Sequence, residues 1–194
     1  MERTERQMRS VPSKFETREE NDELYIEGYF SVFGSIYDLW PGATESVAPG
    51  AFANTLGNDV RALIDHETRL VLGRSKAGTL ELREDSHGLW GKIRINPNDT
   101  DAMNLYNRVK RGDVDQCSFG FNIVKEDTEI REDGSVHWTI REVELFEVSV
   151  VTFPAYEETA VSARKKEYQE MERRKTEAWK AKMNERLKGV RHGT

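Results

Sequence analysis

The segment from Asp115 to Val124 reads Asp-Gln-Cys-Ser-Phe-Gly-Phe-Asn-Ile-Val and predicts a β-strand. Its odd-numbered positions after Asp115 are apolar and its even-numbered positions are small or polar: Cys117, Phe119, Phe121 and Ile123 alternate with Gln116, Ser118, Gly120 and Asn122. A strand turns successive side chains to opposite faces, so these two sets lie on two sides of a sheet. Ser118 therefore points away from the aromatic side, where a cleft would expose it.

A second strand is expected to return beside the first. Arg131-Glu-Asp-Gly134 supplies a turn, and the segment from about Val136 to Thr152 is again strand-like. Strict alternation there puts Glu147 on one face with mostly apolar neighbours: Val143, Leu145, Ser149 and Val151. A carboxylate on such a face is costly unless it is paired or hydrogen-bonded. In a hairpin of these two strands, Ser118 and Glu147 come near each other.

The rest of the central segment predicts a mainly β domain with helices. Strand patterns cover residues 24–33, 60–64, 70–72, 79–82 and 88–95. A short helix is expected between Ser46 and Gly57. One longer helix should follow Pro97, because Asp99 or Thr100 can cap it, Ala102, Leu105, Tyr106 and Val109 share one face, and Gly112 suits its C-terminus.

Leu63-Ile-Asp-His-Glu67 places a histidine between acids at the end of an apolar run. A serine hydroxyl is a weak nucleophile and needs a neighbouring base. Imidazole suits that role near neutral pH, and an acidic group on its far side fixes the tautomer. His66 as base, Ser118 as nucleophile and Glu147 as orienting group therefore form a candidate catalytic triad.

Other interpretations remain open for each of these residues. Each of the three could be purely structural, as most buried serines, histidines and ion-paired glutamates are. Cys117 is an alternative nucleophile, although its position among the aromatic side chains favours a buried thiol. Asp65, His66 and Glu67 could suggest a metal site, but a second His or Cys at ligand spacing is missing.

Composition limits the class of protein. The chain has 194 residues, 33% of them charged and 37% hydrophobic, with a net charge of −6. That charge argues against nucleic acid as the main partner. The single cysteine excludes an internal disulfide and fits a reducing cytosol. Neither a signal peptide nor a membrane-spanning segment is recognised in the sequence.

The charge pattern predicts three regions. Residues 1–22 are expected to form a flexible leader, residues 23–160 the folded domain and residues 161–194 a basic helical tail. Residues 163–194 hold 11 Lys/Arg and 5 Asp/Glu, so this tail is positive while the whole chain is negative. Its apolar side chains form one narrow helical stripe: Tyr168, Met171, Trp179, Met183 and Leu187. The tail is either a solvated helix or a helix that docks on an acidic partner.

Several short motifs together resemble the prohead maturation proteases of tailed bacteriophages, which are related in fold to herpesvirus assemblin. They follow the family's order over roughly residues 24–160. The matching stretches are Gly28-Tyr-Phe-Ser-Val-Phe33, Glu45-Ser-Val-Ala-Pro-Gly-Ala-Phe52, Leu63-Ile-Asp-His66, Val71-Leu-Gly-Arg74, Leu89-Trp-Gly91, Gly112-Asp-Val-Asp-Gln-Cys-Ser-Phe-Gly-Phe121 and Glu147-Val-Ser-Val-Val-Thr-Phe-Pro-Ala-Tyr156.

The resemblance implies an α+β fold with a closed or nearly closed assemblin-like β-barrel. It implies a serine endopeptidase that forms an acyl-enzyme and uses no cofactor or metal. Its catalytic His and Ser motifs fall on His66 and Ser118. Assemblins have a second histidine as third member, whereas this chain offers an acidic residue there, and Glu147 is preferred over Glu144.

The same resemblance implies partners and a location. The substrates would be the major capsid protein, through its scaffolding region, and the protease itself, which in assemblins also dimerises. Cleavage would occur in the host bacterial cytoplasm, inside the assembling prohead, without nucleic acid or membrane. Two alternatives remain: a catalytically silent scaffold or capsid component on the same fold, and an esterase or amidase that uses the same triad.

Overall fold

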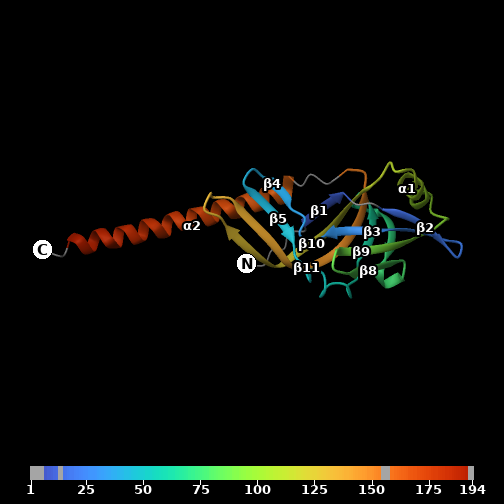
Figure 1. Ribbon diagram of the computed structural model, residues 1–194, viewed down its shortest axis with the longest axis horizontal. Helices are drawn as coiled ribbons and strands as arrows, with labels where there is room; N and C mark the ends of the chain where they lie inside the picture. Colours follow the sequence, from blue (N-terminus) through green and yellow to red (C-terminus); the bar gives the residue numbers. More distant parts are fainter. Residues whose placement is uncertain (1–6, 13–14, 154–157, 192–194) are drawn as a thin grey trace. The chain divides into compact units, whose positions relative to one another are not determined.

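The computed structural model describes residues 7–12, 15–153 and 158–191. The chain divides into two compact units, Met1–Tyr156 and Glu157–Thr194. The first unit consists of strands with one α-helix, and the second is built on one long helix (Figure 1). The predicted mainly β, α+β class is therefore confirmed.

The strands hydrogen-bond in two sheets. The larger, seven-stranded sheet contains β1 (Gln7–Pro12), β4 (Tyr37–Trp40), β5 (Ala43–Val47), β6 (Arg61–Ile64), β7 (Glu67–Arg74), β10 (Gln116–Ile130) and β11 (Val136–Val151). The smaller, four-stranded sheet contains β2 (Glu16–Glu20), β3 (Glu23–Val32), β8 (Leu80–Glu84) and β9 (Gly88–Ile95). In the described part of the chain the two sheets do not join into one closed barrel, so the expected assemblin-like barrel is not confirmed.

Strands β10 and β11 form the long antiparallel hairpin that the alternation predicts, with one important irregularity. Gly120 pairs with Glu147, but the next residue, Phe121, pairs with Leu145. Phe146 is therefore the extra residue of a β-bulge, and the side-chain alternation reverses across it. The expectation that Glu147 shares a face with Val143 and Leu145 is wrong for this reason.

The bulge separates the core from the opposite face of β11. The core cluster contains Val143 and Leu145 before the bulge and Val148 and Val150 after it. Glu147 and Ser149 consequently lie on the other face, together with their cross-strand partners on β10. Without the bulge, the same sequence would direct the carboxylate into the hydrophobic core.

β6 runs parallel to β11 on the edge that β10 leaves free. Its residues Arg61–Ile64 pair with Glu147–Val150, and the amide of Asp65 continues the ladder by donating to the carbonyl of Val150 at 3.0 Å. The central segment of β11 thus lies between β10 and β6. In this register Glu147 lies opposite Arg61, the first residue of β6, and the last residue, Ile64, lies opposite Val150.

Helix α1 (Thr100–Arg111) forms as its sequence predicts. Asp99 is the N-cap and accepts from the amides of Asp101 and Ala102, while Gly112 ends the helix with a φ of 87°. The four predicted apolar residues are all buried: Ala102, Leu105, Tyr106 and Val109. The short helix expected between Ser46 and Gly57 is absent; β5 extends to Val47, and residues 49–57 form turns.

The expected flexible leader, residues 1–22, contains regular structure. β1 pairs with β10 with Ser10 opposite Ser118, and β2 pairs with β3. β1 is held by a buried ion pair: Arg9 Nε and Nη2 donate to the two oxygens of Glu45 at 2.5 and 3.0 Å. The Arg9 side chain is 5% exposed and that of Glu45 is fully buried. The charge run that suggested disorder is thus compatible with strands, because Arg9 enters the interior together with a carboxylate partner.

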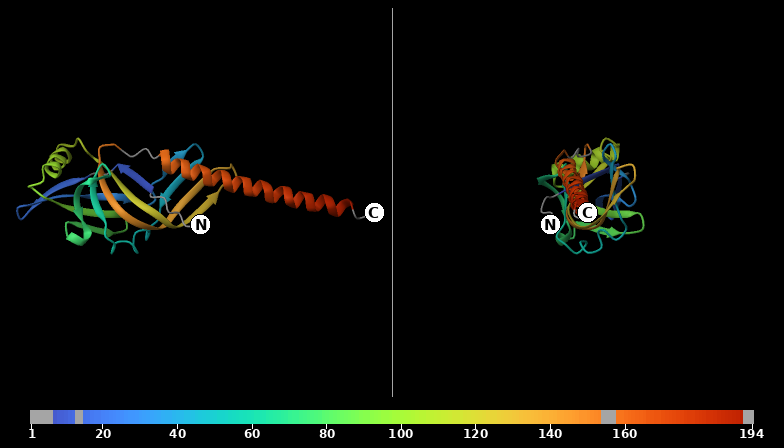
Figure 2. Two further views of the ribbon diagram at one scale, coloured as in Figure 1. Left: turned by 180° about the vertical axis from the view of Figure 1, so that it is seen from behind. Right: turned by 90° about the vertical axis from the view of Figure 1, so that its left-hand side faces the viewer.

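The second unit is built on α2 (Glu158–Arg191), a single continuous helix in both views of Figure 2. Its ion pairs follow helical spacing; Glu170, for example, accepts from Arg173 and Arg174. Trp179 is 62% exposed and Met183 is 37% exposed, so the predicted apolar stripe is uncovered at these residues. Neither α1 nor the described length of α2 carries an apolar run sufficient to span a bilayer.

Replacement of Arg9 by Met should destabilise the domain strongly, because Glu45 would stay buried without its bidentate partner. We expect a loss of about 3–5 kcal/mol in the free energy of unfolding, measured by urea denaturation. The control is Arg18→Met, which removes an ion pair of an arginine that is 54% exposed and should cost less than about 1 kcal/mol. Equal losses in the two variants would contradict a structural role for the Arg9–Glu45 pair.

Candidate functional site

His66 lies in the tight turn between β6 and β7. Asp65 and His66 both have positive φ, 47° and 61°, and the flanking residues Ile64 and Glu67 pair across the hairpin. Two successive left-handed residues are the geometry of a type I′ turn, which is uncommon for residues other than glycine, although aspartate and histidine adopt it more readily than most. Strained backbone of this kind persists only where neighbouring contacts hold it, and it is common at functional sites.

Asp65 supplies such contacts. Its carboxylate accepts from the amide of Thr152 at 2.7 Å and from the Thr152 hydroxyl at 3.2 Å. The turn is therefore tied to the end of β11 through Asp65, while His66 is left to point elsewhere. Of the residues considered for a metal site, Asp65 therefore has both carboxylate oxygens engaged by Thr152.

The base of the same hairpin carries an ion pair. Asp59 accepts from Arg74 Nε at 2.7 Å and Nη2 at 2.5 Å, and Arg61 lies 3.3 Å away. The hydrogen bonds from Arg74 lower the pKa of Asp59 to about 2. The carboxylate thus stays charged in ordinary buffers and joins the two strands that present His66.

His66 contacts Glu147 directly. The distance from His66 Nδ1 to Glu147 Oε1 is 2.7 Å, and the carboxylate side chain is only 3% exposed. A carboxylate accepts hydrogen bonds, so Nδ1 must carry the proton, and in a neutral ring Nε2 then holds the free electron pair. This is the tautomer in which Nε2 acts as a base.

Ser118 lies on the neighbouring strand, on the same face as Glu147. It pairs with Ser149 across the β10–β11 ladder, two pairs along from the Gly120–Glu147 pair. Its hydroxyl is fully buried, and neither Ser118 Oγ nor His66 Nε2 has a hydrogen-bond partner among the residues that the structure describes. Unsatisfied buried polar atoms are uncommon and call for an explanation. The two atoms that a Ser–His pair would use are both in this state.

Two residues that sequence reasoning did not select shape the position of Glu147. Ser149 donates from Oγ to Glu147 Oε2 at 3.1 Å. A Cβ on Gly120 would lie 2.7 Å from Glu147 Oε1 and 2.8 Å from its Cγ, so glycine provides the space that the carboxylate fills. A glycine inside an aromatic strand often marks such a close approach, and this signal was available in the sequence.

The other candidates are placed differently. Glu144 is exposed and accepts from the amide of Asn122 at 3.4 Å, so of the two acids only Glu147 meets His66. Cys117 is buried on the core face and its thiol contacts the carbonyl of Tyr29 at 3.1 Å. His137 is engaged on both ring nitrogens, by the hydroxyls of Thr44 and Ser46 at 2.8 Å each.

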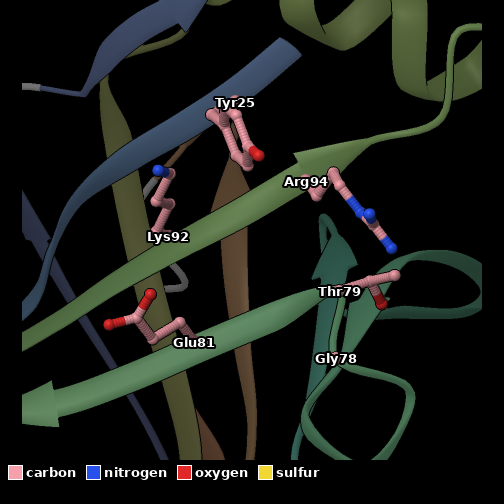
Figure 3. A pocket seen from close by; sticks show the side chains of 6 residues that line it. All are labelled: Tyr25, Gly78, Thr79, Glu81, Lys92 and Arg94. Carbon is pink, nitrogen blue, oxygen red and sulfur yellow. The ribbon is translucent and has the colours of Figure 1, made fainter. Parts of the chain in front are cut away.

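A separate surface pocket lies on the smaller sheet (Figure 3). It is lined by Tyr25, Gly78, Thr79, Glu81, Lys92 and Arg94. Its cations are already engaged: Lys92 Nζ lies 3.9 Å from the ring centroid of Tyr25, and Arg94 donates to Glu23 at 2.9 Å. None of the three predicted site residues lines this pocket.

Comparison with known proteins gives consistent matches. The family model described as caudovirus prohead serine protease matches residues 13–174. The prohead protease of Enterobacteria phage HK97 is 31% identical over 143 residues, which cover 72% of this chain but only 61% of that protein. The solved structure of the bacteriophage T4 capsid assembly protease superposes with a TM-score of 0.50 at 9% identity, covering 75% of this chain and 96% of that one, and shows a shared fold.

Substitution of Gly120 by Ala should displace the Glu147 carboxylate, because the added methyl group would occupy its place. We expect a loss of about 1–3 kcal/mol in unfolding free energy and a changed NMR resonance of the His66 Nδ1 proton. Gly57→Ala is the matched control, since a Cβ there meets nothing within 4 Å. An unchanged His66 resonance in Gly120→Ala would show that the carboxylate does not need this space.

Proposed function

Because the chain belongs to the caudovirus prohead serine protease family, we propose that it is a serine endopeptidase whose triad is Ser118, His66 and Glu147. The observation that carries the proposal is the 2.7 Å contact of His66 Nδ1 with Glu147 Oε1. That contact presents Nε2 as a base on the face of the sheet that also holds Ser118. The order and kinds of residues match the roles of nucleophile, base and orienting acid.

The reaction follows from these roles. Ser118 Oγ attacks the scissile carbonyl carbon while His66 Nε2 takes the hydroxyl proton, giving a tetrahedral intermediate and an imidazolium that Glu147 stabilises. His66 then gives the proton to the leaving amine, the C–N bond breaks, and an acyl-enzyme remains. Water, deprotonated by His66, attacks the ester and releases the acid, and Ser118 recovers its proton.

In the proposed enzyme the described arrangement would be a closed state, because Ser118 is fully buried. A peptide reaches the hydroxyl only after a local movement uncovers it. The absence of a hydrogen bond between Ser118 Oγ and His66 Nε2 is consistent with a closed state, since catalytic hydrogen bonds are often long or misaligned before substrate binds. Peptide binding would then both open the site and align Ser118 with His66.

We further propose that the substrate is the scaffolding region of a major capsid protein, and that the enzyme also cleaves itself. The named relatives support this proposal, as one is a prohead protease and another a capsid assembly protease. Cleavage would take place inside the prohead, in the cytoplasm of the bacterial host, and pairing of two copies as in assemblins is part of the proposal. No step of the mechanism above calls for a metal or a cofactor.

Loss of either reacting group should abolish cleavage. Co-expression with the major capsid protein should yield a shortened capsid band with the wild type and none with Ser118→Ala or His66→Ala, a rate loss on the order of 10⁶-fold. Glu147→Gln should cost roughly 10⁴-fold, because the orienting member of a triad is less costly to lose. His87→Ala, at an exposed histidine in a turn, is the control and should cleave normally.

A fluorophosphonate probe separates the alternatives. Labelling of Ser118 together with a shortened capsid band supports the protease, whereas labelling with ester hydrolysis and an intact capsid band indicates an esterase or amidase. A wild-type protein that neither takes up the probe nor shortens the capsid protein would overturn the proposal in favour of a silent assembly component.

The basic tail is proposed to bring the enzyme to an acidic assembly partner. Residues 163–194 carry 11 Lys/Arg against 5 Asp/Glu, and they lie within the second compact unit. Deletion of residues 163–194 should leave probe labelling of Ser118 unchanged but abolish co-purification of the enzyme with proheads. Normal co-purification of the shortened chain would exclude this role.

A further inference from the structure

We propose that Ser149 is a positioning residue of the site: its hydroxyl fixes the Glu147 carboxylate in the orientation that holds His66. The inference rests on the proposed triad and extends it by a fourth member. Ser149 is fully buried, and Oγ donates to Glu147 Oε2 at 3.1 Å. The other oxygen, Oε1, contacts His66 Nδ1 at 2.7 Å. Each carboxylate oxygen therefore has a donor, one from the same strand and one from the β6–β7 turn.

The need for a second donor follows from how Glu147 is placed. A glutamate has three side-chain torsions, so one hydrogen bond to an imidazole leaves the carboxylate free to rotate. Gly120 opens space beside it, because no Cβ limits the carboxylate from β10. Gly120 thus offers the carboxylate no side chain to hydrogen-bond with, and the Ser149 hydroxyl supplies a second donor from its own strand. The two features are thus complementary.

Ser149 also lies directly opposite Ser118 in the β10–β11 ladder. Facing residues of antiparallel strands have Cβ atoms roughly 5 Å apart, so two opposing serine hydroxyls can compete for the same partners. Here the Ser149 hydroxyl donates its hydrogen bond to Glu147, and Ser118 Oγ has no partner among the described residues. The arrangement keeps the Ser118 hydroxyl available for His66.

Spacing along β11 explains why serine is at this position. Glu147 and Ser149 are two residues apart on the same strand, after the bulge at Phe146, and therefore share a face. A short side chain two residues on reaches the near carboxylate oxygen without crossing the sheet. Leu63, the parallel partner of Ser149 on β6, is also buried.

The test compares Ser149→Ala with Ser149→Thr, which keeps the hydroxyl. The first readout is the rate of Ser118 labelling by a fluorophosphonate probe. The second is the NMR resonance of the His66 Nδ1 proton and its exchange with water, which requires no enzymatic turnover. Ser31→Ala is the control for loss of a buried serine hydroxyl elsewhere, on β3.

We expect Ser149→Ala to label about tenfold more slowly and its His66 Nδ1 proton to exchange faster, because a hydrogen bond to a charged group is lost. Ser149→Thr and Ser31→Ala should resemble the wild type in the proton resonance. A resonance and exchange rate in Ser149→Ala equal to those of the wild type would overturn the inference. Slower labelling in both Ser149 variants, with an unchanged His66 Nδ1 proton resonance in each, would also overturn it. That result would indicate a general loss of stability around the site.

The failure of the proposed function gives a different pattern. If Ser118 is not a nucleophile, the wild type takes up no probe, whereas the Nδ1 proton still reports whether Ser149 holds Glu147 against His66. The two conclusions are therefore separable in one set of samples.

Discussion

The antiparallel pairing of β10 with β11, with its bulge at Phe146, is the constraint on which the rest of the site depends. It assigns the apolar residues on both sides of the bulge to the core and Glu147 to the opposite face. The next constraint follows from burial, because a carboxylate that is 3% exposed needs hydrogen-bond donors. His66 comes from the turn after β6 and Ser149 from β11 itself, so the fold supplies one donor on each side.

Glu45 and Glu147, the buried acids among the described residues, have different kinds of partner. Glu45 meets Arg9 in a bidentate ion pair that holds β1 against β10, and this pairing is structural. Glu147 meets an imidazole and a hydroxyl, both weaker donors than a guanidinium. A guanidinium beside Glu147 would pair with the carboxylate more strongly, but it would take the place of the imidazole, which can accept and release a proton. The difference in partners distinguishes an acid that stabilises the fold from one suited to chemistry.

Local patterns in the sequence predicted the hairpin, helix α1 with its caps, and the residues His66, Ser118 and Glu147, whose catalytic roles remain proposals. They did not predict the bulge, because alternation around Val143–Glu147 looks regular and only pairing with β10 reveals the extra residue. The strand β1 was missed for a similar reason: Arg9 suggests a solvated segment until its distant partner Glu45 is known. The roles of Gly120 and Ser149 likewise depend on contacts across or along the sheet that spacing alone does not specify.

The bulge sets where this chain tolerates changes in length during evolution. Residues 131–135 form the turn at the far end of the hairpin, and gains or losses there leave the register near Ser118 untouched. Loss of one residue after the bulge, at Val148, would instead exchange the inward and outward sides of the strand segment that follows. Distant homologues should therefore differ freely in the hairpin tip while keeping the number of residues from Glu147 to Ser149.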